Sequence, residues 1–257
     1  MAGYTTQELM VARAAKELKD GDVVFVGIGV PSLAVNLAHR THAPGLCMIY
    51  ESGAVGCVPK RLPISIGDPC LVTGSLAVVP MVDVFNLYLQ RGLIDVGFLG
   101  GAQVDRFGNI NSTVIGDYRK PKVRLPGSGG ACEIALLSKR VVITIGNSKR
   151  TLPERVDFVT SPGFLRGGRE RESLKVEGGG PELVITDMGV YRFDPETREM
   201  VLVSLHPGLT VAKIKENIGW DVKVARDLTE TQPPTPAEIR IIREELDPKG
   251  IFLRSKG

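Results

Sequence analysis

Short apolar runs alternate along the chain with stretches in which apolar positions recur every three or four residues. Residues 23–26 form a continuous apolar run, as in a strand buried on both faces, and lead through a glycine-containing turn to a helix that begins at Pro31 and ends near His39. Residues 46–50 form the next apolar run, again followed by a glycine turn. This order predicts an α/β fold whose functional loops follow the carboxyl ends of strands.

The remaining pattern predicts a single open, largely parallel sheet of at least six strands flanked by helices, forming one domain over residues 1–257. Thr5 with Glu8 and Thr235 with Glu238 have the spacing of capping boxes, and Thr210 is placed to cap a helix. The three prolines of residues 231–236 indicate a stiff linker rather than a domain boundary. Further strands are expected at residues 70–73, 96–99, 141–145, 183–186 and 222–224, a helix at 82–90, and hairpins with long loops within 101–115 and 118–130.

Composition is that of an ordinary soluble globular protein, with 43% hydrophobic and 24% charged residues. The net charge of +3 comes without obvious clusters of Lys and Arg, which argues against nucleic acid as a partner. The longest stretch without charged residues or histidine, residues 23–38, is too short and too broken by glycine and proline to span a membrane. The N-terminus has neither the basic nor the apolar region of a signal peptide. The spacing of the four cysteines fits neither a disulfide scaffold nor a metal pair, so we expect a reducing cytoplasm.

Several common chemistries lack their motifs. No P-loop is present, and the segment that begins at Gly27 lacks the third glycine of a dinucleotide fingerprint. Ser52 has Tyr50 and Ala54 where a nucleophile elbow needs glycines. His39, His42 and His206 do not have metal-ligand spacing, so no metal is implied.

One carboxylate stands out from this background, because Glu51 directly follows a buried strand and closely precedes Gly53. A glutamate at a strand end is most often a solvated loop residue. The apolar residues before it, however, place this carboxylate at the edge of a core, where desolvation favours a covalent nucleophile. A second glycine cluster, residues 127–131, either forms a simple tight turn or presents backbone N–H groups to an oxyanion.

Five short motifs follow one another along residues 20–225, and their order carries more information than any one of them. They are Gly27-Ile28-Gly29-Val30-Pro31, Glu51-Ser52-Gly53-Ala54-Val55-Gly56, Gln103-Val104-Asp105-Arg106-Phe107-Gly108, Gly127-Ser128-Gly129-Gly130-Ala131 and Gly208-Leu209-Thr210-Val211. With this ordered set the chain resembles the β subunit of class I coenzyme A transferases, the family of the 3-oxoacid and glutaconate CoA-transferases. Tyr50-Glu51-Ser52-Gly53 looks closer to the glutaconate branch than to the Ser-Glu-Asn-Gly of the oxoacid branch.

The resemblance implies a NagB/RpiA-like fold, no permanently bound cofactor, and a separate α subunit in an α2β2 or α4β4 hetero-oligomer. It implies an enzyme that moves CoA from an acyl-CoA to a free carboxylic acid, through an acyl-glutamyl anhydride and a glutamyl-CoA thioester. Carried over to this chain, Glu51 is the catalytic nucleophile; Asn111, Gly129 and Gly130 are candidates for oxyanion and substrate binding; and Gly27, Gly29, Ser52 and Gly53 are candidates for binding CoA and the acyl group.

Two alternatives stay open beside this hypothesis. Cys57, six residues beyond Glu51, could serve a thiol-based decarboxylase or hydrolase of the same fold, although a buried structural cysteine is the commoner explanation. The chain could also be a non-catalytic subunit that binds acyl-CoA, which the presence of Glu51 disfavours. Whether the acyl group is a dicarboxylate or a 3-oxo acid also stays open.

Overall fold

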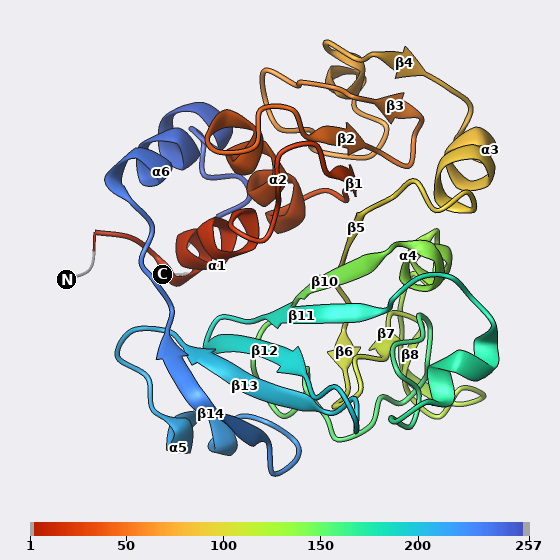
Figure 1. The fold of residues 1–257 in the computed structure, drawn as a ribbon, viewed down its shortest axis with the longest axis vertical. Helices are drawn as coiled ribbons and strands as arrows, with labels where there is room; N and C mark the ends of the chain where they lie inside the picture. The colour runs from red at the N-terminus through yellow and green to blue at the C-terminus, as the bar shows by residue number, and fades with distance from the viewer. Residues whose placement is uncertain (1–2, 254–257) are drawn as a thin grey trace. The chain divides into compact units, whose positions relative to one another are not determined.

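The computed structural model of the protein describes residues 3–253 and divides into two compact units (Figure 1). The first unit comprises the described residues of Met1–Phe98 and Gln232–Gly257, and the second comprises Leu99–Thr231. The chain returns from the second unit to the first within the proline-containing segment of residues 231–236. The single domain expected from the sequence stays a prediction.

The first unit is built on a sheet in which β5, β1, β2, β3 and β4 lie side by side in that order. β1 pairs in parallel with both β2 and β5, whereas β3 pairs antiparallel with β2 and with β4. β4 is therefore the outer strand on that side of the sheet. The strands are β1 (Val23–Phe25), β2 (Cys47–Ile49), β3 (Ala54–Val55), β4 (Ala77–Val78) and β5 (Val96–Leu99).

Helices of the first unit begin at the caps that the sequence indicates. Thr5 and Thr235 each form a complete capping box, with their side chains accepting from the backbone N–H groups of Glu8 and Glu238. The longer helices are α1 (Thr6–Ala15), α2 (Val30–Arg40) and α6 (Pro236–Arg240), which continues into the π-helical turn η4 (Ile241–Leu246); shorter turns are η1 (Pro69–Val72), α3 (Met81–Asp83) and η2 (Val84–Leu89).

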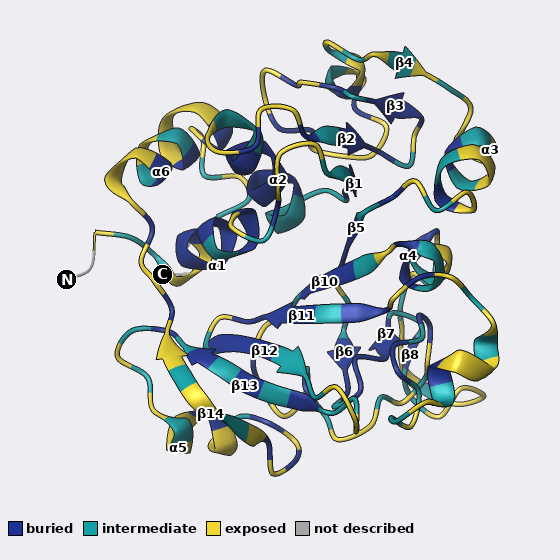
Figure 2. Ribbon diagram, viewed as in Figure 1, coloured by how far each residue is buried: buried dark blue, intermediate teal, exposed yellow. Residues whose placement is uncertain are grey.

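Helix α2 forms the centre of the helical layer of this unit. Its residues from Ser32 through Ala38 are all buried, as Figure 2 shows by the dark blue of this helix. α1 and η4 both pack against it. Because its small and aliphatic side chains fill the space on every side, α2 fixes the position of the loop that leads into it from β1.

The second unit contains a mixed sheet in which β10 to β14 lie in chain order. β10 pairs in parallel with β11, and β13 with β14, while β11–β12 and β12–β13 are antiparallel. The β6–β7 hairpin lies within the predicted segment 101–115, whereas the β8–β9 hairpin runs from that segment into the predicted segment 118–130. The elements are β6 (Gln103–Val104), β7 (Ile110–Asn111), β8 (Val114–Gly116), β9 (Pro121–Arg124), α4 (Ala131–Leu137), β10 (Arg140–Thr144), η3 (Glu170–Leu174), β11 (Pro181–Ile185), β12 (Gly189–Phe193), β13 (Met200–Leu205), α5 (Val211–Glu216) and β14 (Lys223–Glu230).

The predicted α/β class is confirmed, and one predicted strand is wrong. The sequence predicts an extended segment at residues 70–73, but Pro69–Val72 forms the 3₁₀ turn η1. Pro69 lacks an N–H for strand pairing, and the Asp68 carboxylate accepts from the backbone N–H of Cys70, which caps a helical turn instead. No helix within residues 3–253 is long and apolar enough to cross a membrane.

An ion pair links the first and last helical segments of the first unit. The Arg243 guanidinium donates to both Glu8 carboxylate oxygens, at 2.6 and 2.9 Å, and the Glu8 carboxylate also accepts from the Thr5 backbone N–H. Burial acts to raise the pKa of Glu8, but these hydrogen bonds outweigh it and hold the pKa below its usual value. Glu8 therefore stabilises the fold when it is ionised.

We expect Glu8→Gln to lower the free energy of unfolding at pH 7 by about 1 kcal/mol, because glutamine keeps a capping oxygen but loses the charge. A carboxyl group with a lowered folded-state pKa contributes stability above its unfolded pKa and loses it as the pH falls. The difference from the wild type, measured by urea denaturation, should therefore shrink as the pH falls below 4.5, the ordinary pKa of the group.

The matched control is Glu245→Gln, which removes the longer, half-exposed ion pair with Arg40 at 3.5 Å. We expect it to change stability by less than about 0.5 kcal/mol. An equal or larger effect of Glu245→Gln would contradict the assignment of Glu8 as the anchoring carboxylate.

Candidate active site

Glu51 lies at the apex of a tight turn that connects β2 to β3. The Gly53 backbone N–H donates to the Tyr50 carbonyl at 2.9 Å, and the Tyr50 N–H donates to the Ala54 carbonyl at 3.0 Å. Glu51 and Ser52 are thus the two central residues of a four-residue turn. Glu51 is half-buried and Ser52 is exposed.

The residue before Glu51 anchors this turn to α2. The Tyr50 side chain is fully buried, and its hydroxyl lies 2.9 Å from the Ser32 hydroxyl. The Ser32 carbonyl in turn accepts from the Asn36 amide. Burial raises the pKa of Tyr50 to about 12, so the phenol stays neutral and places no negative charge beside Glu51 at physiological pH. The backbone from which Glu51 projects is therefore held in place by a buried hydrogen bond.

Gly53 is a glycine because the chain that follows β4 passes directly against it. Its φ of +108° lies in the region that favours glycine, and a Cβ there would overlap the Val79 carbonyl oxygen. The Val79 N–H donates to the Gly53 carbonyl at 3.0 Å. The φ of Gly56 is +61°, and a Cβ there would overlap the Leu76 side chain. Both glycines of the Glu-Ser-Gly-x-x-Gly segment thus allow the chain around β4 to approach the turn more closely than a side chain would permit.

The Glu51 side chain itself has no hydrogen-bond or ion-pair partner within residues 3–253. A half-buried carboxylate without such a partner keeps its oxygen lone pairs available to an electrophile. The Gly53 N–H, next to the apex on the β3 side, is already used by the Tyr50 carbonyl of the same turn.

Gly27 and Gly29 lie at the same edge of the sheet as Glu51. β1 and β2 are parallel with Phe25 opposite Ile49, so Gly27 and Glu51 each follow a paired residue by two positions. A Cβ on Gly27 or Gly29 would meet no atom within 4 Å, so the space in front of this loop is open. The carboxyl edge of neighbouring parallel strands is where ligands bind in open α/β sheets. The predicted acyl and CoA residues of the first unit are therefore brought together.

The predicted oxyanion residues all belong to the second unit. The Gly127 N–H donates to the Ser112 carbonyl at 2.8 Å, and the Ser112 hydroxyl donates back to the Gly127 carbonyl at 2.8 Å. The strand end at Asn111 and the glycine cluster of residues 127–131 are thus joined directly. Among the described residues, the N–H groups of Gly129 and Gly130 have no hydrogen-bond acceptor.

Asn111 is a structural residue in this arrangement. Its side chain is fully buried, and its amide nitrogen donates to the Gln103 side chain and to the Val114 carbonyl, both at 2.7 Å. Its oxygen accepts from the N–H groups of Thr113 and Val114. Both amide protons are already used, so the geometry does not favour the predicted role of Asn111 as an oxyanion donor. It fixes the β6–β7 hairpin and the turn that follows.

Cys57 is an unfavourable nucleophile. Its side chain is buried, and its thiol lies 3.9 Å from the Met48 carbonyl, to which it donates. Burial raises the pKa of the Cys57 thiol to about 12, so almost no thiolate is present near neutral pH. The thiol is therefore part of the packing under β2 and β3.

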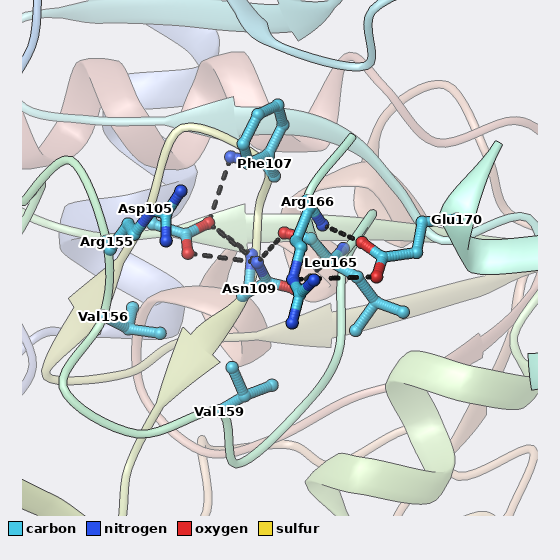
Figure 3. A pocket seen from close by; sticks show the side chains of 9 residues that line it. All are labelled: Asp105, Phe107, Asn109, Arg155, Val156, Val159, Leu165, Arg166 and Glu170. Carbon is cyan, nitrogen blue, oxygen red and sulfur yellow. Dashed lines mark hydrogen bonds and ion pairs between the residues drawn. The ribbon is translucent and has the colours of Figure 1, made fainter. Parts of the chain in front are cut away.

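A pocket of about 320 Å³ in the second unit lies beside the β6–β7 hairpin (Figure 3). At its base the buried Asp105 carboxylate accepts from the backbone of Phe107 and from the Asn109 amide, which also donates to the Leu165 carbonyl. In the sequence this segment stands out only as part of a motif. These hydrogen bonds tie the loop between β6 and β7 to the segment that contains Leu165. Its lining residues are Asp105, Phe107, Asn109, Arg155, Val156, Val159, Leu165, Arg166 and Glu170.

The chain is similar to known proteins over nearly its whole length. A family model for coenzyme A transferase matches residues 7–217. The B subunit of 3-oxoadipate CoA-transferase from Pseudomonas knackmussii is 49% identical over 243 residues, covering 95% of this chain and 94% of the relative. The B subunit of glutaconate CoA-transferase from Acidaminococcus fermentans is 40% identical over 256 residues, covering 98% of this chain and 96% of the relative.

Solved structures give the same result. The crystal structure of glutaconate coenzyme A-transferase from Acidaminococcus fermentans matches with a TM-score of 0.92 at 39% identity, covering 98% of both chains. A more distant match is the crystal structure of the decarboxylase AibA/AibB, with a TM-score of 0.81 at 28% identity, covering 96% of this chain and 97% of that chain.

We expect Gly53→Ala to lower the free energy of unfolding by about 2–4 kcal/mol, from the strained φ and the overlap with the Val79 carbonyl together. Gly27→Ala is the matched control, since Gly27 has no positive φ and open space around it. That control should change stability by less than about 0.5 kcal/mol. Urea denaturation of both variants checks this, and equal stabilities would show that the chain around β4 does not constrain the turn.

Proposed function

We propose that this chain, which belongs to the coenzyme A transferase family as a class I β subunit, carries the covalent centre of the enzyme at Glu51. The observation that supports this most strongly is the carboxylate at the apex of the anchored turn, half-buried and without a partner within residues 3–253. A surface carboxylate that only increases solubility does not require a fixed backbone. The backbone at Glu51, in contrast, is anchored by buried Tyr50 and by the chain that packs against Gly53.

In the first half-reaction, a Glu51 carboxylate oxygen attacks the thioester carbonyl carbon of the donor acyl-CoA. The carbon–sulfur bond breaks, CoA leaves as the thiolate, and an acyl-glutamyl anhydride remains. The thiolate then attacks the glutamyl carbonyl carbon of this anhydride. The donor leaves as a free carboxylate and takes one Glu51 oxygen with it, and a glutamyl-CoA thioester is formed.

The second half-reaction runs the same steps in reverse with the acceptor. The acceptor carboxylate attacks the glutamyl thioester, CoA leaves as the thiolate, and a new anhydride forms. The thiolate then attacks the acceptor acyl carbon, and Glu51 is released as a carboxylate. Each step exchanges an acyl group between oxygen and sulfur with no change in oxidation state, so we propose that no permanently bound cofactor takes part.

The residues around Glu51 suit this chemistry because they leave space for the substrate. Gly27 and Gly29 present no side chain at the carboxyl edge of β1, which allows the acyl group and the thiol end of CoA to approach Glu51 closely. We assign Ser52 and Gly53 to the same binding edge. In the second unit, the unused N–H groups of Gly129 and Gly130 are donors for the oxyanion of the tetrahedral intermediates.

The substrate class that we propose is a dicarboxylic acid and its CoA thioester. Glutaconate and 3-oxoadipate, which the names of the two relatives give as substrates, both carry a second carboxylate remote from the reacting one. Both relatives are B subunits, so this chain acts with an α subunit in a hetero-oligomer. We propose an α2β2 or α4β4 assembly.

The thiol-based alternative has one observation in its favour, the likeness to the decarboxylase AibA/AibB. The burial and raised pKa of Cys57 count against a thiolate mechanism in this chain. A non-catalytic subunit would not need a carboxylate at position 51, so the presence of Glu51 disfavours that alternative.

We expect Glu51→Gln, in complex with the α subunit, to reduce CoA transfer by at least about 10⁴-fold, because the amide cannot form the anhydride. Cys57→Ser should stay within about threefold of the wild type, because serine can donate the same hydrogen bond to the Met48 carbonyl. Steady-state transfer assays of the complexes measure both. Full activity of Glu51→Gln would refute the proposed function, and loss of activity in the properly folded Cys57→Ser variant would favour the thiol mechanism.

Chemical trapping locates the covalent step independently of any variant. After incubation of the complex with acyl-CoA alone, hydroxylamine should convert the acylated Glu51 to a hydroxamate, because the glutamyl carbonyl is activated in both proposed intermediates. Peptide mass spectrometry identifies the modified residue. In a parallel sample analysed without hydroxylamine, an acyl group on Cys57 with Glu51 unmodified would contradict the mechanism.

A further inference from the structure

The segment from Pro69 to Gln90 carries a single charged side chain, that of Asp83, and yet much of it is exposed. Leu76 is 83% exposed, Val78 64%, Val82 57% and Met81 52%. We call these four residues the β4 face, after the strand around which they lie. Single exposed aliphatic side chains are ordinary, but a run of them without interspersed charge marks an interaction surface.

The strand β4 differs from an ordinary surface strand because its exposed positions are apolar. Apolar residues occupy the exposed positions at Leu76, Val78 and Pro80, while Ala77 and Val79 between them are half-buried (Figure 2). β4 is also the outer strand on its side of the first unit's sheet. Proteins usually protect such an edge with charges, and none stands between Val72 and Val82. A covering protein surface accounts for both the edge and the face.

The β4 face is continuous with the turn that holds Glu51. The Leu76 N–H donates to the Val55 carbonyl at 2.9 Å, and the Val79 N–H donates to the Gly53 carbonyl at 3.0 Å. Exposed Val78 is thus followed directly by the residue that presses on Gly53. A surface that covers the β4 face comes to within a few residues of the Glu51 carboxylate.

We propose that the β4 face is the docking surface for the α subunit, and that docking removes water from the Glu51 turn. This inference rests on the proposed function, because an acyl-glutamyl anhydride hydrolyses readily and needs a dry site. The chain alone leaves Glu51 only half-buried, with the uncovered apolar surface beside it.

The chemistry of the β4 face fits a permanent partner. Obligate interfaces are more apolar than transient ones and are depleted of charged residues at their centre, as this face is. The partner surface is therefore expected to be apolar and uncharged, with aromatic or aliphatic side chains that fill the spaces between Val78, Met81 and Val82. The α subunit is the occupant because the relatives are B subunits and because the face adjoins the catalytic turn.

The test is the affinity of the double variant Val78→Glu/Val82→Glu for the α subunit encoded in the same genome. Both side chains are more than half exposed, so the free chain should fold with an unchanged denaturation midpoint. Because two unpaired carboxylates would be buried in the interface, the α subunit should bind at least about 100-fold more weakly. Calorimetric titration, carried out with Glu51→Gln also present, measures binding without the chemistry.

Ile251→Glu is the matched control, since Ile251 is 50% exposed in the same unit and lies outside the β4 face. It should bind the α subunit within about threefold of the parent chain. Hydrogen exchange of the complex provides a second measurement, in which the backbone amides of residues 76–82 should become protected on addition of the α subunit.

Unchanged α-subunit affinity of the double variant, or unprotected amides at residues 76–82 in a formed complex, would overturn the inference. A stable homodimer that forms through this face and persists when the α subunit is added would overturn it as well. None of these results touches the proposed function, which is refuted instead if the Glu51→Gln complex transfers CoA at the wild-type rate.

Discussion

The close passage of the chain around β4 against Gly53 is the constraint on which the proposed active site depends. Only glycine tolerates both the φ of +108° and the contact with the Val79 carbonyl, and this contact closes the Tyr50–Gly53 turn tightly enough to put Glu51 at its apex. On the other side, the buried Tyr50 hydroxyl ties the turn to Ser32 of α2. Glu51 is thus held between a packed helix and an edge strand, while its own carboxylate makes no contact within residues 3–253 that would neutralise it.

Glu51 and Cys57 illustrate how environment selects the reactive group. They lie six residues apart on consecutive chain segments, and both side chains are nucleophilic in principle. The thiol is buried beneath the sheet with its pKa raised to about 12, whereas the carboxylate projects from the turn beside the open loop of Gly27 and Gly29. The sequence alone leaves both chemistries open, and burial strongly favours the carboxylate.

Local signals predicted the fold well where the cause of the structure was itself local. The capping boxes at Thr5 and Thr235 and the strand at Val96–Leu99 occur where the sequence predicts them. Antiparallel β12 and β13 were not predicted, although the Asp194-Pro195 turn between two apolar runs was a usable signal. The role of Asn111 could not be foreseen in full. Three of its four hydrogen bonds are local, to Thr113 and Val114, but the fourth takes up an amide proton with the Gln103 side chain on the neighbouring strand of the β6–β7 hairpin. Likewise, the apolar residues around β4 are of the same types as core residues, and only their exposure distinguishes them.

The central claim, that Glu51 is a covalent carrier, is tested most directly by following oxygen atoms. The mechanism passes one carboxylate oxygen from the acceptor acid to Glu51 in each turnover, because the bridging oxygen of the second anhydride stays with the enzyme when CoA attacks the acceptor acyl carbon. If the complex is given an acceptor whose carboxylate carries isotopically heavy oxygen, the peptide containing Glu51 should gain that label, as measured by mass spectrometry. Turnover that leaves the Glu51 carboxylate unlabelled would contradict the account.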